Sequence, residues 1–268
     1  MPPRRGLPAA RSPYEARRLV APPRPSPARA RRGHAPAPPP PDPATLPPPS
    51  RAVVPRLEGK LTFDGELTEP VWARAARLGP FRPASGQGEA REATFVRVWH
   101  DGEALYLGWE CSDADIQATF TARDSRFWEE EVVEFFVTRD DLTRYYELQW
   151  NPLGGEFDAI ITNDLDARGV SRSFKGDWSY TAKGMRSGVK VRGTVQKSGD
   201  RDLDWRVEVR IPFTDLGGPA PRAGEVWRAN FYRFNREQGR KEEMLSWSPP
   251  MLPGFHQPTR FGFLEFGR

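Results

Sequence analysis

Hydrophobic and polar residues alternate in short runs along most of the chain. Residues 93–99 read Ala-Thr-Phe-Val-Arg-Val-Trp, and a second run at 104–110 follows the pair Asp101-Gly102. Asp-Gly between two alternating runs is among the strongest short-range signals of a β-hairpin. Further runs of this kind predict strands at 132–138, 145–150, 157–161, 188–196, 205–211, 226–234 and 261–266.

A helical spacing of apolar residues is almost absent. The best exception is 69–76, where a proline near the start and alanines after it predict one or two turns. Residues 205–211 alternate cleanly, so we expect their apolar side chains to face the core and their charges to face water. Many short strands separated by turn residues predict an all-β protein, with two antiparallel sheets packed face to face in a β-sandwich.

The beginning of the chain has a different composition. Residues 1–50 include seventeen prolines and nine arginines, but only two acids and no tryptophan. Such a segment buries too little apolar surface to offset its chain entropy. The sequence therefore predicts a disordered Pro/Ala/Arg-rich tail over 1–52 and one folded domain over 53–268, which holds all nine tryptophans.

The charge divides between the same two parts. Nine arginines and two acids give the start +7, which leaves −3 for the remainder of a chain with a formal net charge of +4. A basic tail could contact nucleic acid or an anionic membrane. The body carries no nucleic-acid motif, so a solvated linker is the simpler interpretation.

Several classes of protein find no support in the sequence. No apolar stretch reaches the roughly 20 residues that a membrane span needs. No secretory signal is readable, because the arginine pairs near the start are not followed by an apolar core. The single Cys111 excludes an intrachain disulfide or a thiolate metal cluster, and we expect it as a small apolar residue in or beside a strand.

The acid-rich stretch at residues 128–134 raises the hypothesis of a glycoside-processing enzyme, which needs two carboxyl groups across the scissile bond. In a strand, Val132 and Glu134 would share one face, whereas Glu131, Val133 and Phe135 would share the other. Glu131 and Glu134 would then point in opposite directions, which argues against catalysis. Because an unpaired buried carboxylate is costly, Glu134 is either a surface residue or a ligand contact.

Aromatic rings beside polar groups are suited to binding sugars, since a ring covers the apolar face of a pyranose while polar groups bind its hydroxyls. Trp128 precedes the strand that carries Glu134, so it is the candidate stacking residue; a buried core tryptophan is the alternative. A second acidic set comprises Asp113, Asp115 and Asp124 in predicted loops. Such loops have the form of calcium ligands, although turn capping explains them equally well.

An ordered set of motifs over about residue 61 to the C-terminus resembles the family 9 carbohydrate-binding modules, a branch of the DOMON-like β-sandwiches. Each motif is weak alone, and the order makes the set specific. The motifs include Phe63-Asp64-Gly65-Glu66-Leu67, Trp128-Glu129-x2-Val132-Val133-Glu134, Asn151-Pro152-x-Gly154, Trp227-Arg228-x-Asn230-Phe231-x-Arg233 and Phe261-Gly262.

The resemblance implies a jelly-roll-like sandwich, a structural calcium ion, and an aromatic clamp for a glucose or xylose unit of an oligo- or polysaccharide, often at a chain end. Carried onto this sequence, it implies the ligand-binding residues Trp128, Glu134, Asn151, Gln149 and Phe255, and the metal candidates Asp113, Asp115, Asp124 and Glu131.

Two positions depart from the pattern of the sugar-binding members. Phe255 stands where they have tryptophan, and Gln149 stands where a basic residue can occur. Phenylalanine stacks with less area and has no indole N–H. The departure implies a sugar affinity that is weaker, altered in specificity or lost.

We therefore expect a monomeric, non-catalytic module whose partner is a saccharide; the sequence identifies no partner glycoside hydrolase. Many relatives are exported, which places the protein outside the cell or in its envelope by resemblance alone. One alternative is a β-sandwich for interaction or adhesion without sugar binding. Another is a DOMON-like haem or redox module with His256 or Met251 as an axial ligand.

Overall fold

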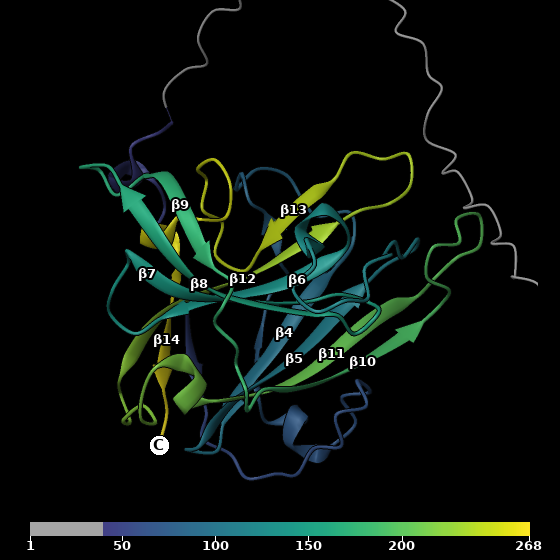
Figure 1. Ribbon diagram of the computed structural model, residues 1–268, viewed down its shortest axis with the longest axis horizontal. Helices are drawn as coiled ribbons and strands as arrows, with labels where there is room; N and C mark the ends of the chain where they lie inside the picture. Colours follow the sequence, from purple (N-terminus) through teal and green to yellow (C-terminus); the bar gives the residue numbers. More distant parts are fainter. Residues whose placement is uncertain (1–39) are drawn as a thin grey trace, which may run out of the picture. The chain divides into compact units, whose positions relative to one another are not determined.

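The computed structural model describes residues 40–268, which fold into two β-sheets packed as a sandwich (Figure 1). The predicted tail before residue 40 lies outside the described residues. The larger sheet has nine strands, and seven of them follow the order β1 (Arg51–Val54), β14 (Gly262–Phe266), β12 (Val226–Asn235), β6 (Val132–Thr138), β7 (Arg144–Trp150), β8 (Glu156–Leu165) and β9 (Ser171–Asp177).

The two other strands of this sheet branch from β12. Strand β13 (Glu243–Ser246) pairs with β12, and β3 (Arg82–Pro83) pairs with β13. The second sheet has five strands in the order β10 (Arg186–Arg192), β11 (Asp204–Pro212), β5 (Ala104–Ser112), β4 (Thr94–His100) and β2 (Ala76–Leu78). The short 3₁₀ helices of the described residues are η1 (Pro43–Thr45), η2 (Pro70–Ala73), η3 (Phe127–Glu129), η4 (Phe213–Leu216) and η5 (Pro258–Arg260).

The prediction of an all-β sandwich is confirmed. The Asp-Gly turn joins β4 to β5 in an antiparallel hairpin, and the one predicted helical segment forms η2. Each alternating run became a strand, although β10 begins and ends earlier than the predicted 188–196. Strand β9 was not predicted, because its sequence Ser-Arg-Ser-Phe-Lys-Gly-Asp has no alternating apolar residues.

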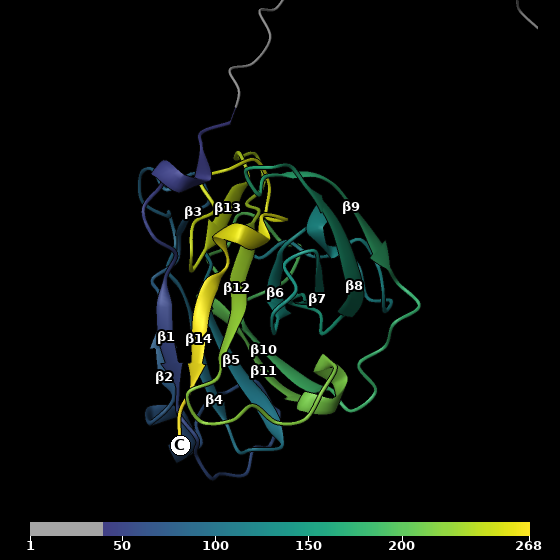
Figure 2. The same cartoon turned by 90° about the vertical axis from the view of Figure 1, so that its left-hand side faces the viewer.

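Strand β6 separates two hydrophobic clusters on its two faces. Val133 and Phe135 belong to the main core between the sheets, together with the indoles of β5 and β11. Val132 and Phe136 lie on the outer face of the larger sheet, in a second buried cluster. The predicted alternation is confirmed, and Figure 2 shows β6 near the middle of its sheet, between β12 and β7.

The expectation for residues 205–211 was wrong at one position. Trp205, Val207 and the other apolar side chains of β11 are buried as predicted, but Glu208 is also fully buried. Its carboxylate accepts hydrogen bonds from the Trp72 indole and the Gly65 backbone N–H, each at 2.9 Å. The segment before β2 covers this outer face of the smaller sheet, and alternation alone could not show that cover.

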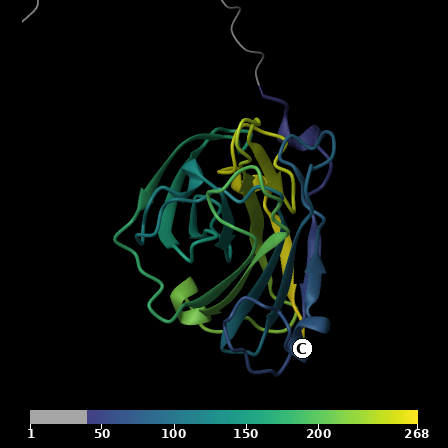
Figure 3. The same cartoon turned by 90° about the vertical axis from the view of Figure 1, so that its right-hand side faces the viewer.

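The predicted boundary at residue 52 is also too late. Strand β1 starts at Arg51 and pairs in parallel with β14, as Figure 3 shows where the purple and yellow strands run side by side. The Ser50 hydroxyl donates to the Trp247 carbonyl at 3.0 Å, and Arg260 donates to the Pro47 carbonyl at 2.6 Å. The prolines at 47–49 directly precede β1, which pairs at the edge of the larger sheet. A boundary drawn from composition alone therefore came too late.

Arg233 of β12 ties the two sheets together from inside the core. Its Nη2 donates to Asp113 Oδ2 at 2.8 Å and to Glu131 Oε1 at 2.9 Å, and all three side chains are fully buried. Its Nη1 donates to the Ser112 carbonyl of β5 at 2.8 Å and to the Thr94 hydroxyl of β4 at 3.1 Å. Burial raises the pKa of both carboxyl groups, and the positive charge of Arg233 opposes this shift at each of them.

Replacing Arg233 should destabilise the protein strongly. Arg233→Met leaves two buried carboxyl groups without their cation, and removing one partner of a buried ion pair costs about 3–5 kcal/mol of unfolding free energy. Urea denaturation measures this change. Arg126→Met is the control, because the Arg126–Glu129 pair is exposed and such pairs contribute about 1 kcal/mol or less. Equal losses in the two variants would contradict the assigned role of Arg233.

Candidate ligand-binding site

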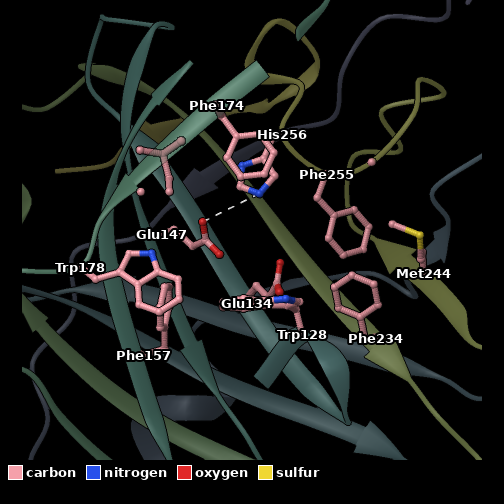
Figure 4. Close-up of a pocket in the computed structure, with 13 residues that line it drawn as sticks. Trp128, Glu134, Glu147, Phe157, Phe174, Trp178, Phe234, Met244, Phe255 and His256 are labelled. Carbon is pink, nitrogen blue, oxygen red and sulfur yellow. Dashed lines mark ion pairs between the residues drawn. The ribbon is translucent and has the colours of Figure 1, made fainter. Parts of the chain in front are cut away.

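A cavity of about 440 Å³ opens on the outer face of the larger sheet, the face turned away from the smaller sheet. Strands β6, β7, β8 and β12 form its floor, and β9 and the segments before β6 and after β13 form its walls. Figure 4 shows two carboxyl groups surrounded by aromatic rings. The lining residues are Trp128, Glu134, Glu147, Phe157, Ile161, Phe174, Gly176, Trp178, Phe234, Met244, Gly254, Phe255 and His256.

Trp128 lines this cavity from η3, the turn that leads into β6. Its neighbour Phe127 is fully buried and anchors the turn, while Trp128 itself stays half-buried. Arg236 holds the turn from the other side by donating to the Trp128 carbonyl at 2.7 Å. Trp128 and Glu134, the predicted stacking residue and a predicted ligand contact, line the same cavity.

Trp178 forms a second wall of the cavity, and the sequence patterns did not predict it. It follows β9, is 46% exposed, and its ring lies 5.8 Å from Trp128 and 5.5 Å from Phe157, in edge-to-face arrangements. Gly176 makes room for it, because a Cβ there would come within 2.6 Å of the indole nitrogen. The sequence signal for this wall was a tryptophan in a polar stretch. A tryptophan that has no predicted core position is a candidate for a binding surface.

Phe255 lines the cavity but is only 3% exposed. One face of its ring stacks on Tyr232, with ring centres 4.1 Å apart, and Phe234 packs against it at 4.8 Å. The phenyl ring is therefore largely covered by its own protein. Phe255 remains a predicted ligand contact, but it offers less free surface than Trp178.

Glu134 and Glu147 face the cavity from neighbouring strands. Glu134 of β6 pairs in register with Gln149 of β7, which places Glu147 one step away diagonally on the same face. Glu134 is 2% exposed, and its carboxyl group makes no hydrogen bond to any other residue that the structure describes. Burial raises the pKa of Glu134 well above its ordinary value, and the nearby Glu147 adds to this shift. Burial also raises the pKa of Glu147 to about 8.

His256 sits over Glu147 but carries no charge near neutral pH. Burial lowers the pKa of its ring to about 3. Tyr145 Oη lies 2.7 Å from Nδ1, and Phe174 stacks on the ring with centres 3.5 Å apart. The 4.0 Å contact from Nε2 to Glu147, drawn as a dashed line in Figure 4, is therefore a contact between neutral groups.

The two predicted amide contacts do not line the cavity. Gln149 is fully buried and donates from Nε2 to Glu147 Oε1 at 2.5 Å, so it supports a cavity residue from behind. Asn151 donates to the Phe120 carbonyl at 2.8 Å and accepts from the Gly155 backbone N–H at 2.7 Å. Asn151 thus shapes the turn between β7 and β8.

The four predicted metal ligands do not come together. Asp113 and Glu131 hold the guanidinium of Arg233 between them. Asp115 accepts hydrogen bonds from Gln117 and from Ser198 of a distant loop, and Asp124 lies beside an arginine. In residues 40–268, no group of three or more His, Cys, Asp or Glu side chains is placed to hold a metal ion. These residues do not fit a calcium site, because a cationic side chain already occupies the space between two of them.

The family is shown by the sequence itself. Residues 90–266 match the model of carbohydrate-binding family 9, which is more than half of the chain, and the chain belongs to this family. A search of curated proteins gives no match. Within the described residues, no helix is long and apolar enough to cross a membrane.

Solved structures share the fold at low sequence identity. A candidate carbohydrate-binding protein from Bacteroides uniformis matches with a TM-score of 0.63 at 19% identity, covering 81% of this chain and 99% of its own. Family 9 modules from Caldicellulosiruptor kristjanssonii match with TM-scores of 0.54 in complex with glucose and 0.52 in complex with cellotriose. The glucose complex is 17% identical in sequence, and the match covers 82% of this chain and 97% of that chain. The cellotriose complex is 15% identical, and the match covers 82% of this chain and 95% of that chain.

The carboxyl pair should make the protein less stable as the pH rises. Between the ordinary pKa near 4.5 and the raised values in the fold, the unfolded chain loses protons first, so unfolding becomes easier. Each unit of pKa difference corresponds to about 1.4 kcal/mol. Urea denaturation should show that the free energy of unfolding falls more between pH 5 and pH 8 for the wild type than for Glu134→Gln/Glu147→Gln.

The exposed Glu129 supplies the control for this measurement. Glu129→Gln should keep the pH dependence of the wild type. If the double variant keeps it as well, the two cavity carboxyl groups do not have raised pKa values.

Proposed function

We propose that this cavity binds a saccharide without cleaving it. The observation that carries the proposal is a buried carboxyl group, Glu134, that faces a cavity walled by Trp128 and Trp178 and has no protein partner among the described residues. Indole rings cover the apolar face of a pyranose, and a carboxyl group binds its hydroxyls. The volume of about 440 Å³ lies in the range of roughly 300–1,000 Å³ that is usual for small-molecule sites.

The ligand class that we propose is a glucose- or xylose-type oligo- or polysaccharide. Membership of carbohydrate-binding family 9 supports it, and two structural neighbours hold cellotriose and glucose. We propose Trp128 and Trp178 as the main stacking surfaces, because both keep ring area accessible. Phe255 would contribute a smaller apolar contact beside them.

The alternatives receive less support from the site. Glu131 points into the core and binds Arg233, so it cannot act with Glu134 on one glycosidic bond. Phe174 stacks on the ring of His256 with ring centres 3.5 Å apart, and this cover does not favour a haem ligand. A pure interaction domain would not explain an unpartnered buried carboxyl group at the floor of an aromatic cavity.

Truncation of either tryptophan should abolish or weaken binding. Titration calorimetry with cello- and xylo-oligosaccharides should give saturable binding to the wild type, with affinity at least about fivefold lower for Trp128→Ala and Trp178→Ala, since a lost stacking contact removes roughly 1 kcal/mol or more. Leu203→Ala is the control, because Leu203 is exposed and lies outside the cavity. A wild type that binds nothing on a broad glycan array would contradict the proposed function.

A further inference from the structure

The cavity contains two carboxyl groups and no cationic side chain to balance them. Glu134 and Glu147 face it, and among the described residues neither lysine nor arginine lines it. His256, the one basic residue of the lining, is neutral at pH 7 because burial lowers its pKa to about 3. Gln149, directly opposite Glu134 on the next strand, is uncharged.

The wider surroundings of Glu134 are also negative. The charged groups that act on it are Glu147 and Glu242, and both raise its pKa. Arg236 is the cation nearby, but it pairs with Glu242 and donates to the backbone carbonyls of Trp128 and Glu130. Its positive charge is therefore paired with Glu242 and does not line the cavity.

Aromatic rings close most of the remaining surface. Six of them surround the carboxyl groups, and half-exposed Phe174 and Trp178 form the rim (Figure 4). The face of an aromatic ring carries negative potential and attracts cations, most strongly when water is excluded. Rings and carboxyl groups together thus favour one kind of chemical group, an ammonium.

We propose that the saccharide bound here is an amino sugar with a free ammonium group, which lies between Glu134 and Glu147. This inference rests on the proposed saccharide-binding function and narrows its ligand class. A neutral sugar gives a buried carboxylate no opposite charge. An ammonium group supplies that charge inside the cavity, so a carboxyl group can ionise there.

Binding of such a ligand is coupled to a proton. In the free protein burial raises the pKa of Glu134 and raises that of Glu147 to about 8, so the pair retains protons that ordinary carboxyl groups have already lost. When the ammonium enters, a carboxyl group ionises and its proton passes to the solvent. Of the other groups facing the pair, His256, Tyr145 of β7 and Tyr232 of β12 stay uncharged near pH 5.5, because burial lowers the pKa of the imidazole and raises that of each phenol. The remaining charges nearby are the ion pair of Glu242 with Arg236.

Three β-1,4-linked trisaccharides test the inference at pH 5.5, where the amine of the free ligand is already an ammonium, because they differ at C2 of each unit. They are fully deacetylated chitotriose with an ammonium, acetylated chitotriose with a neutral amide, and cellotriose with a hydroxyl. Titration calorimetry should give an affinity at least tenfold higher for the deacetylated ligand than for the other two. Repeating the titration in buffers of different ionisation enthalpy should show proton release for that ligand only.

Variants of the carboxyl pair provide a second readout. Glu134→Gln/Glu147→Gln should reduce the preference for deacetylated chitotriose over cellotriose to less than about threefold and abolish the proton release. Glu129→Gln, an exposed acid outside the cavity, should keep both. Circular dichroism checks that the double variant folds.

The outcomes separate this inference from the proposed function. Cellotriose binding as tightly as deacetylated chitotriose overturns the amino-sugar inference and leaves saccharide binding intact. If none of the three sugars binds, both proposals fail. If choline, a cation without a sugar ring, binds as tightly as deacetylated chitotriose, the cavity recognises the charge alone and the amino-sugar inference is overturned.

Discussion

The buried guanidinium of Arg233 is the interaction on which the arrangement of this protein depends. It joins β12 of one sheet to β4 and β5 of the other, and it binds Glu131 at the entrance of β6. Strand side chains alternate between two faces, so fixing the inner face of β6 also fixes its outer face. Glu134 is held in position at the cavity floor because its neighbours on the other face are held in the core.

The cavity itself works against folding. Two carboxyl groups are removed from water, and six aromatic rings surround a space that they do not fill. Each feature costs free energy in the unbound protein. The sandwich core, with fully buried indoles from β5, β7, β11 and β12, supplies the stability that lets the outer face keep an open site with buried carboxyl groups. Strained or costly groups of this kind commonly mark functional sites.

Part of this architecture could be predicted from residue patterns. Alternation located most strands, and the same rule correctly separated Glu131 from Glu134. The neighbourhood of Trp128 and Glu134 followed from their closeness in sequence. Trp178 could not be found in this way, because β9 is a polar edge strand and reaches Trp128 only through pairing with β8. Phe255, a predicted ligand contact, lines the cavity, but its stacking on Tyr232 could not be read from spacing.

The sequence by itself determined the class of fold and the face on which each strand residue lies, because a period of two is a local property of the extended chain. It did not determine which faces are covered. Glu208 was expected in water and is buried under a distant loop, and Asp113 and Glu131 were expected at a metal and bind Arg233. Only the tertiary structure decided these partners, since burial and charge pairing depend on segments that are far apart along the chain and meet when the two sheets pack.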